Sequence, residues 1–251
     1  KRPDRPYRNR PGSACCLGRI RGSSVMESLE HKIGYTFQDI KHLETAITHK
    51  SFVNEKMVGR YMSYERYEFL GDAILEFIVS KYLFENYQTM PEGDLSKLRS
   101  SLVCEFTLSK ISRDLRFGEF ARFSKGERQT GGANRDSILC DMFESVLGAI
   151  YLDGGMECAT AYVERFLLQD IEHKQRFHDA KSMLQEYVQK HKINLQYELL
   201  AEEGPDHNQF TVRVVLDGKE MARKVAHSKK TAEQYAAFET LELLHQPTGK
   251  R

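Results

Sequence analysis

The sequence predicts a two-domain protein in which an all-α domain precedes a small α+β domain with the element order α-β-β-β-α. Its 251 residues are enough to bury one large core and still form a second, smaller domain. Between residues 26 and 177, apolar residues recur at intervals of three and four, which indicates helices. From residue 179 onward, this pattern gives way to segments in which apolar and polar residues alternate, as in β-strands. The change of period predicts a domain boundary close to residue 178.

Turn-forming residues divide the helical part of the chain. The clearest helical periodicity covers residues 40–47, 69–83 and 138–152. Breaks are expected at Gly34, at residues 90–93 and at residues 126–134. The last of these is expected to be a flexible connector, because it lacks the Gly-Lys-Ser/Thr ending of a phosphate-binding loop.

The smaller domain is predicted from two helices and three strands. The helices are expected over residues 179–191 and 228–244, and the strands over residues 196–201, 209–216 and 219–226. Asp217 and Gly218 are typical of a hairpin turn between the last two strands. Ser228 is expected to cap the final helix.

Charge is distributed unevenly along the chain, although the net charge is only +1. Residues 1–25 carry seven basic side chains and one acid, whereas residues 26–178 carry nineteen basic side chains and twenty-four acids. An acidic domain repels a polyphosphate unless divalent cations neutralise it. We expect residues 1–25 to be a disordered tail or an addition made for expression. Residues 26–155 are expected to form the helical domain core, residues 156–178 its terminal helix and linker, residues 179–246 the second domain, and residues 247–251 a tail.

Apolar runs and cysteines limit the class of protein. No apolar run is long enough to cross a bilayer, so a membrane protein is not expected. The five cysteines form no Cys-x-x-Cys pair and have no histidine at zinc-site spacing. Their odd number favours reduced thiols and a cytoplasmic location.

The first acidic cluster follows helical spacing. Glu65, Glu68 and Asp72 are separated by three and four residues, which places them along one stripe of a helix. The adjoining arc is expected to anchor this helix in the core through Phe69, Leu70, Ala73, Ile74 and Phe77. The acidic stripe would then face a cleft or solvent.

The second acidic cluster lies in a later helix. Asp141 and Glu144 share a face with Ser145 and Gly148, whose small side chains permit close approach of another element. Two such helices crossing would gather carboxylate oxygens, the ligands that Mg²⁺ prefers. Acids at helical spacing also form ordinary solvated faces, and Glu76 extends the first stripe in that way. Spacing by itself leaves both interpretations open.

The acidic segments lie in a longer pattern that resembles the ribonuclease III family. Residues 65–72 read E-R-Y-E-F-L-G-D, which resembles the signature of that family, although Tyr64 stands where the signature usually begins with Asn. Similar matches occur at residues 48–51, 91–96 and 136–144. Together they cover nearly all of residues 26–155 in the order of the family.

The resemblance implies a homodimeric endoribonuclease that uses Mg²⁺, with Mn²⁺ as a substitute. Such an enzyme hydrolyses both strands of double-stranded RNA by metal-assisted attack of water, leaving 5′-phosphate and 3′-hydroxyl ends with short 3′ overhangs. The implied substrates are ribosomal RNA precursors and structured messenger RNA. The implied metal ligands are Glu68, Asp72, Asp141 and Glu144, and the implied catalytic residues are Asp72, Glu144, Glu65 and Glu92. Phe69 matches a residue at the dimer interface, while a plain core phenylalanine remains the alternative.

The C-terminal segment resembles the double-stranded-RNA-binding domain at residues 179–186, 204–207 and 228–234. The resemblance implies that Gln185 and His207 reach minor grooves and that Lys229 and Lys230 grip phosphates. Arg223 and Lys224 would add to the positive charge that faces the phosphates. Lys224 and Ala226 replace the glycines that often precede the lysine pair, which leaves the local turn geometry open. An unimportant surface pair is the alternative for the two lysines.

Two other functions are compatible with parts of this pattern. A catalytically inactive relative would act as a structural protein that binds double-stranded RNA, but such relatives usually lose metal ligands. A binding domain fused to an unrelated helical domain would leave the ordered upstream motifs unexplained.

Overall fold

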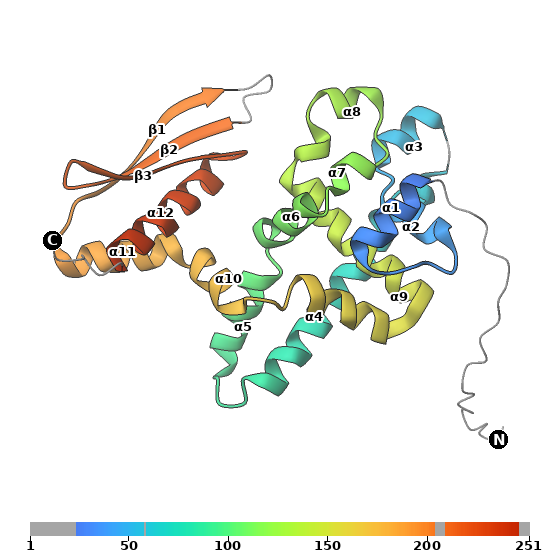
Figure 1. Ribbon diagram of the computed structural model, residues 1–251, viewed down its shortest axis with the longest axis horizontal. Coiled ribbons are helices and arrows are strands. Elements are labelled where there is room, and N and C mark those ends of the chain that lie inside the picture. The colour runs from blue at the N-terminus through green and yellow to red at the C-terminus, as the bar shows by residue number, and fades with distance from the viewer. Residues whose placement is uncertain (1–23, 58, 204–208, 246–251) are drawn as a thin grey trace.

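The computed structural model describes residues 24–57, 59–203 and 209–245. In Figure 1, a helical body is followed along the chain by a module in which three strands lie beside two helices. Residues 1–23 and 247–251 of the expected tails lie outside the described residues, whereas Ser24 and Val25 begin the first helix.

The helical domain is built from the following elements: α1 (Ser24–Ile33), α2 (Ile40–Ala46), α3 (Lys50–Lys56), η1 (Arg60–Met62), α4 (Glu65–Asn86), α5 (Glu92–Leu102), α6 (Glu105–Asp114), α7 (Phe117–Phe120), α8 (Lys125–Gln129), η2 (Gly132–Asn134), α9 (Asp136–Phe166) and α10 (Ile171–His178). Its centre is formed by two long helices, α4 and α9, which pack against each other. Inside α9, Gly155 adopts φ 79° and ψ −173° and kinks the helix. A left-handed φ of this kind favours glycine because it has no Cβ.

The α4–α9 crossing depends on two glycines. A Cβ added to Gly71 would lie 1.8 Å from the carbonyl oxygen of Glu144. A Cβ added to Gly148 would lie 2.4 Å from the carbonyl oxygen of Tyr67. The backbones of the two helices are therefore in direct contact, which confirms the close approach predicted at Gly148.

The buried face of α4 differs from the expected one. Ile74 is buried as predicted, together with Leu75, Ile78 and Val79, whereas Phe69 and Phe77 are 80% and 55% exposed. Ala73, from the same predicted arc, is also exposed, so the prediction that Phe69, Ala73 and Phe77 anchor the core was wrong. The close crossing at Gly71 turns α4 so that its aliphatic residues face α9 and the aromatic rings face outward.

The stretch at residues 126–134 is more ordered than the expected flexible connector. It contains most of α8 and the short turn η2. Arg135 forms an ion pair with Glu127 at 2.7 Å, and Arg128 donates to the carbonyl oxygen of Ala121 at 2.7 Å. These local contacts explain why a glycine-rich sequence forms compact turns here.

The second domain has the predicted α-β-β-β-α order. Its elements are α11 (Ala180–His191), β1 (Leu195–Glu203), β2 (Gln209–Leu216), β3 (Lys219–Ala226) and α12 (Lys229–His245). The sheet is antiparallel with strand order β1-β2-β3. Leu184 and Val188 of α11 and Ala236 and Leu241 of α12 form the core of the domain together with Val214 of β2. Asp217 and Gly218 both have positive φ, which confirms the predicted hairpin turn.

Aromatic rings join the two domains. Phe177, at the end of α10, stacks on Phe106 of α6 with ring centroids 4.3 Å apart, and Tyr235 of α12 lies 5.0 Å from Phe177. The Gln234 side chain donates hydrogen bonds to the carbonyl oxygens of Phe177 and His178, which lie at the C-terminal end of α10. The segment after α9 is thus a helix whose end packs against the second domain.

The crossing contact gives a testable prediction about stability. We expect Gly71→Ala to lower the free energy of unfolding by about 1–3 kcal/mol, because the new methyl group must push two backbones apart. Urea denaturation measures this change. Gly93→Ala is the matched control, since nothing lies within 4 Å of a Cβ added to that exposed helical glycine. Equal unfolding midpoints for the two variants would contradict the crossing argument.

Candidate active site

Three carboxylates from the two central helices converge at their crossing. Glu68 of α4 meets Asp141 and Glu144 of α9, and one oxygen atom from each lies within 4.8 Å of the others. This convergence is possible because Gly71 packs against the backbone of Glu144, so that the two helices approach each other closely. The two acidic clusters predicted from the sequence therefore meet at one place.

Electrostatics at this cluster are unfavourable for negative charge. Burial raises the pKa of Glu144 to about 8, with further contributions from the nearby charges of Asp72, Asp141 and Glu68. Burial also raises the pKa of Glu68 and of Asp141. For Asp141, a hydrogen bond from Tyr64 and the charge of Lys50 act in the opposite direction.

This donor set fits a hard divalent cation. Carboxylate oxygens are the ligands of Mg²⁺ and Mn²⁺, and a cation placed among them would offset the burial and the like-charge repulsion that raise their pKa values. The Cys140 thiol is 4.0 Å from Glu144 Oε1, and burial raises the pKa of that thiol, so it remains neutral. The chemistry of the site is therefore that of oxygen ligands.

The other predicted acids lie around this cluster at different distances. Asp72 is exposed and lies outside the three-residue group, although its charge raises the pKa of both Glu68 and Glu144. Glu65 is exposed at the rim and forms an ion pair with Lys50 at 3.3 Å. Glu76, which extends the stripe, is instead 2.9 Å from Arg99 Nε. The stripe thus divides into a part that converges with α9 and a residue, Glu76, that is paired with Arg99 while its charge still contributes to the raised pKa of Glu144.

Glu92 does not join the cluster within one chain. It is the first residue of α5, is exposed, and accepts a hydrogen bond from Ser96 Oγ at 2.8 Å. α4 runs from beside the cluster to Asn86 before α5 begins. At a rise of 1.5 Å per residue, the stretch of α4 after Glu68 is about 27 Å long, and this stretch separates Glu92 from the cluster.

Two contacts around the cluster were missed by the sequence reasoning. Tyr64 Oη donates to Asp141 Oδ2 at 2.9 Å, and Lys50 lies close enough for its charge to act on Asp141. The sequence offered a weak signal for both: Tyr64 departs from the usual first residue of the signature, and Lys50 lies in the matched stretch at residues 48–51. Neither signal says which carboxylate is contacted.

Phe69 lies on the surface beside the site, which excludes the plain core alternative. Its ring is 80% exposed and lines a hollow together with Tyr61, Met62 and Leu152.

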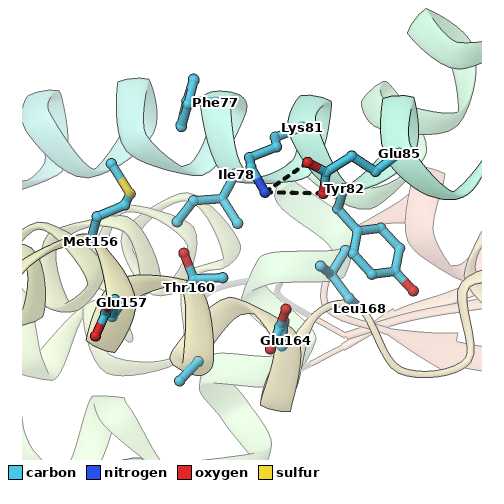
Figure 2. A pocket seen from close by; sticks show the side chains of 11 residues that line it. Phe77, Ile78, Lys81, Tyr82, Glu85, Met156, Glu157, Thr160, Glu164 and Leu168 are labelled. Atoms are coloured by element: carbon cyan, nitrogen blue, oxygen red, sulfur yellow. Dashed lines mark hydrogen bonds and ion pairs between the residues drawn. The ribbon is translucent and has the colours of Figure 1, made fainter.

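A second hollow, between α4 and the later part of α9, is shown in Figure 2. There Phe77 and Met156 flank the opening, and Lys81 forms an ion pair with Glu85.

The lysine pair of the second domain is exposed at a helix N-terminus. Lys229 and Lys230 are the first residues of α12, and neither forms an ion pair with another described residue. Ser228 Oγ accepts a hydrogen bond from the backbone N–H of Thr231 at 3.1 Å, which confirms the predicted cap. Gln185 is exposed on α11, and His207 lies outside the described residues.

Arg223 and Lys224 are engaged in ion pairs. Arg223 binds Glu220 at 3.0 Å, and Lys224 binds Glu239 of α12 at 3.0 Å. Lys224 and Ala226, which replace the usual glycines, both lie in β3 and pair with β2, so the turn to α12 consists of residues 227–228 only.

Comparison with known proteins gives two family matches. Residues 39–171 match the model described as ribonuclease-III-like, and residues 180–244 match the double-stranded RNA binding motif. The chain is similar to Ribonuclease 3 of Geobacillus kaustophilus, with 46% identity over 222 residues that cover 87% of this chain and 90% of that protein. It is also similar to Ribonuclease 3 of Pediococcus pentosaceus, with 42% identity over 232 residues that cover 89% of this chain and all of that protein.

A solved structure resembles the helical domain. It is the nuclease domain of ribonuclease III from Campylobacter jejuni, with a TM-score of 0.53 and 42% identity, covering 56% of this chain and 94% of that one. In the described part of this chain, no helix is long and apolar enough to span a membrane.

The raised pKa of Glu144 predicts a pH dependence of stability without metal. Between the pKa of an unfolded-chain glutamate, about 4.3, and that of folded Glu144, about 8, the folded state holds a proton that the unfolded chain has released. The free energy of unfolding therefore falls as pH rises through this window. Glu144→Gln cannot ionise, so in a chelator we expect it to be about 1–3 kcal/mol more stable than the wild type at pH 8.

Denaturant unfolding at several pH values measures this difference. The exposed Glu157→Gln change on the same helix is the control, and we expect it to follow the wild type. Parallel pH profiles for wild type and Glu144→Gln would contradict the expected burial effect.

Proposed function

The chain belongs to the ribonuclease III family, and we propose that it cuts double-stranded RNA at the cation site formed by Glu68, Asp141 and Glu144. Membership makes it an endoribonuclease of the ribonuclease III type with a double-stranded-RNA-binding domain. The observation that carries the proposed location is the convergence of three partly buried carboxylates within 4.8 Å. Exposed Asp72 lies beside them and is proposed to complete the ligand set from the side open to substrate.

The proposed cation is Mg²⁺, with Mn²⁺ as a substitute. When bound, it supplies an acidified water and charge stabilisation for the phosphodiester that is cut. Glu68, Asp141 and Glu144 hold it from the protein side, while Asp72 and Glu144 are the residues we place closest to the reacting phosphate. Glu65 lies at the rim of the site, and we propose that its ion pair with Lys50 helps to orient the RNA as it approaches the cation. The proposed products have 5′-phosphate and 3′-hydroxyl ends and short 3′ overhangs, and the proposed substrates are ribosomal RNA precursors and structured messengers.

The nuclease site gives a direct prediction. We expect Mg²⁺-dependent cleavage of a long RNA duplex by the wild type and at least a ~100-fold slower rate for Glu144→Ala, because the cation loses a ligand. Duplex binding should be kept, since the second domain is unchanged. Glu76→Ala, on the same stripe but paired with Arg99, is the control and should cut normally. Duplex binding without any cutting by the wild type would favour the inactive relative instead.

The second domain is proposed to grip the RNA backbone through Lys229 and Lys230. Both are exposed beside the capped N-terminus of α12, where backbone N–H groups and the helix dipole favour phosphate. Two lysines at this end destabilise a helix unless an anion is bound, so their placement supports a phosphate-binding role. Gln185 and His207 are proposed to reach the minor grooves, with weaker contributions from Arg223 and Lys224, which must first leave Glu220 and Glu239.

The lysine pair is testable by its salt dependence. For the double change Lys229→Ala and Lys230→Ala, we expect duplex affinity to fall about tenfold or more and the slope of log affinity against log salt to flatten by roughly 1–2. Fluorescence anisotropy at several salt concentrations measures both. Lys219→Ala, at the opposite end of β3, is the control. An unchanged slope in the double variant would remove these lysines from the interface.

We propose a homodimer that joins through the outer face of α4 and the adjacent part of α9. This face carries exposed apolar side chains in both elements, namely Phe69, Phe77, Phe84, Leu152 and Met156. The hollow beside Phe69 offers a matching recess on a second copy. The nuclease domain from Campylobacter jejuni is described as flexible in a region involved in dimer formation, which supports the proposal. In a dimer, the distant Glu92 is proposed to serve the cluster of the partner subunit.

Phe69→Glu should produce a monomer, because it places a charge in an apolar contact. Sedimentation velocity measures the mass. Val225→Glu is the control, since Val225 is 57% exposed on β3 of the other domain and should leave the dimer intact. A dimer that persists in Phe69→Glu at micromolar concentration would exclude this contact.

We infer a cytoplasmic location and a division into the domains expected from the sequence, with residues 156–178 as terminal helix and linker. The free thiols of Cys104, Cys140 and Cys158 support the location, because such thiols persist in a reducing compartment. Cell fractionation tests it, and recovery with an oxidising compartment would contradict it.

A further inference from the structure

Tyr64 makes a buried contact with one of the proposed metal ligands. Its hydroxyl donates to Asp141 Oδ2 at 2.9 Å, and the residue is only 3% exposed. Tyr64 is also the N-cap residue of α4, yet its side chain makes no capping hydrogen bond. The ring instead crosses from the start of α4 to α9. Asparagine, usual at this place in the signature, is a favoured cap, whereas the tyrosine here contacts Asp141 and forms no capping hydrogen bond.

The tyrosine is held firmly on the side away from Asp141. Its backbone N–H donates to the carbonyl oxygen of Thr48 at 2.9 Å. Its ring lies 5.7 Å from that of His49, which is 4% exposed and is fixed by accepting the N–H of Ser51 at its Nδ1 atom. A phenol hydroxyl facing a carboxylate can only donate the hydrogen bond between them, because an ionised carboxylate has no proton to give. The position of the donor is therefore set by the fold before any cation binds.

We propose that Tyr64 is a positioning residue that holds Asp141 so that this carboxylate binds the catalytic cation through one oxygen only. The hydrogen bond engages Oδ2 and leaves Oδ1 for the cation. Residues that hydrogen-bond to ligating carboxylates orient them and commonly change metal affinity by about 10–100-fold. The inference rests on the proposed cation site and concerns how that site selects its metal.

Binding through a single oxygen favours Mg²⁺ over Ca²⁺. Mg²⁺ requires near-ideal octahedral geometry with short bonds, whereas Ca²⁺ takes more ligands and accepts carboxylates through both oxygens. A carboxylate fixed by a tyrosine hydroxyl cannot turn freely to offer both oxygens. Loss of the hydroxyl should therefore weaken Mg²⁺ binding while affecting Ca²⁺ much less.

The test uses the full chain with Tyr64→Phe, which removes only the hydroxyl. Titration calorimetry without RNA measures Mg²⁺ and Ca²⁺ affinity directly, and cleavage of an RNA duplex is followed as a function of Mg²⁺ concentration. We expect Mg²⁺ to bind about tenfold more weakly, Ca²⁺ to change by less than about threefold, and cleavage to recover at high Mg²⁺. Tyr67→Phe is the matched control, because its hydroxyl lies on the same helix but 2.9 Å from His42 Nδ1.

The outcomes separate this inference from the proposed site. If Mg²⁺ binding is lost in Glu144→Ala but unchanged in Tyr64→Phe, the site stands and the positioning role is wrong. Equal losses of Mg²⁺ and Ca²⁺ affinity in Tyr64→Phe, or the same loss in Tyr67→Phe, also overturn the role. If Glu144→Ala binds Mg²⁺ as the wild type does, the proposed site itself is wrong.

Discussion

The direct backbone contact between α4 and α9 is the constraint on which the active site depends. Gly71 and Gly148 allow the two helices to touch without intervening side chains. Because the helices are this close, carboxylates from both reach the same small volume, although burial and like charge oppose their ionisation. The same crossing turns the aromatic side of α4 outward, so the geometry that builds the site also exposes the face proposed for dimerisation.

Electrostatics divide the work of RNA cleavage between the two domains. The helical domain carries the acidic cluster, which would repel RNA by itself, and a bound cation would offset much of this negative charge. The second domain presents exposed lysines at a helix N-terminus, a suitable place for phosphate. The aromatic contact of Phe106, Phe177 and Tyr235 joins α6 and α10 of the helical domain to α12 of the second domain. Phe106 is preceded on α6 by Glu105, whose charge acts on Cys140 beside the cluster.

Contacts around the ligands determine how each carboxylate behaves. Glu76 continues the stripe of Glu68 and Asp72 but is neutralised by Arg99, whereas Asp141 is bonded by Tyr64. Carboxylates on the two central helices therefore differ in role, and contacts with neighbouring residues decide which of them remain available to a cation. This is also why Arg223 and Lys224, expected to face RNA, lie in ion pairs with acids that the sequence pattern did not connect to them.

The sequence by itself determined the order of the domains, the α-β-β-β-α module with its Asp217–Gly218 turn, and the carboxylates that converge, because these depend on local periodicity, turn chemistry and recognisable motifs. It misplaced Phe77 and left Phe69 between the core and a surface role, since helical spacing gives the relative angles of residues on α4 but not which angle faces α9. It placed Glu92 in the acidic site without showing that α4 separates it from the cluster. Only the tertiary structure decided these points and the Tyr64–Asp141 contact, because each depends on where elements distant in sequence cross and how closely they approach.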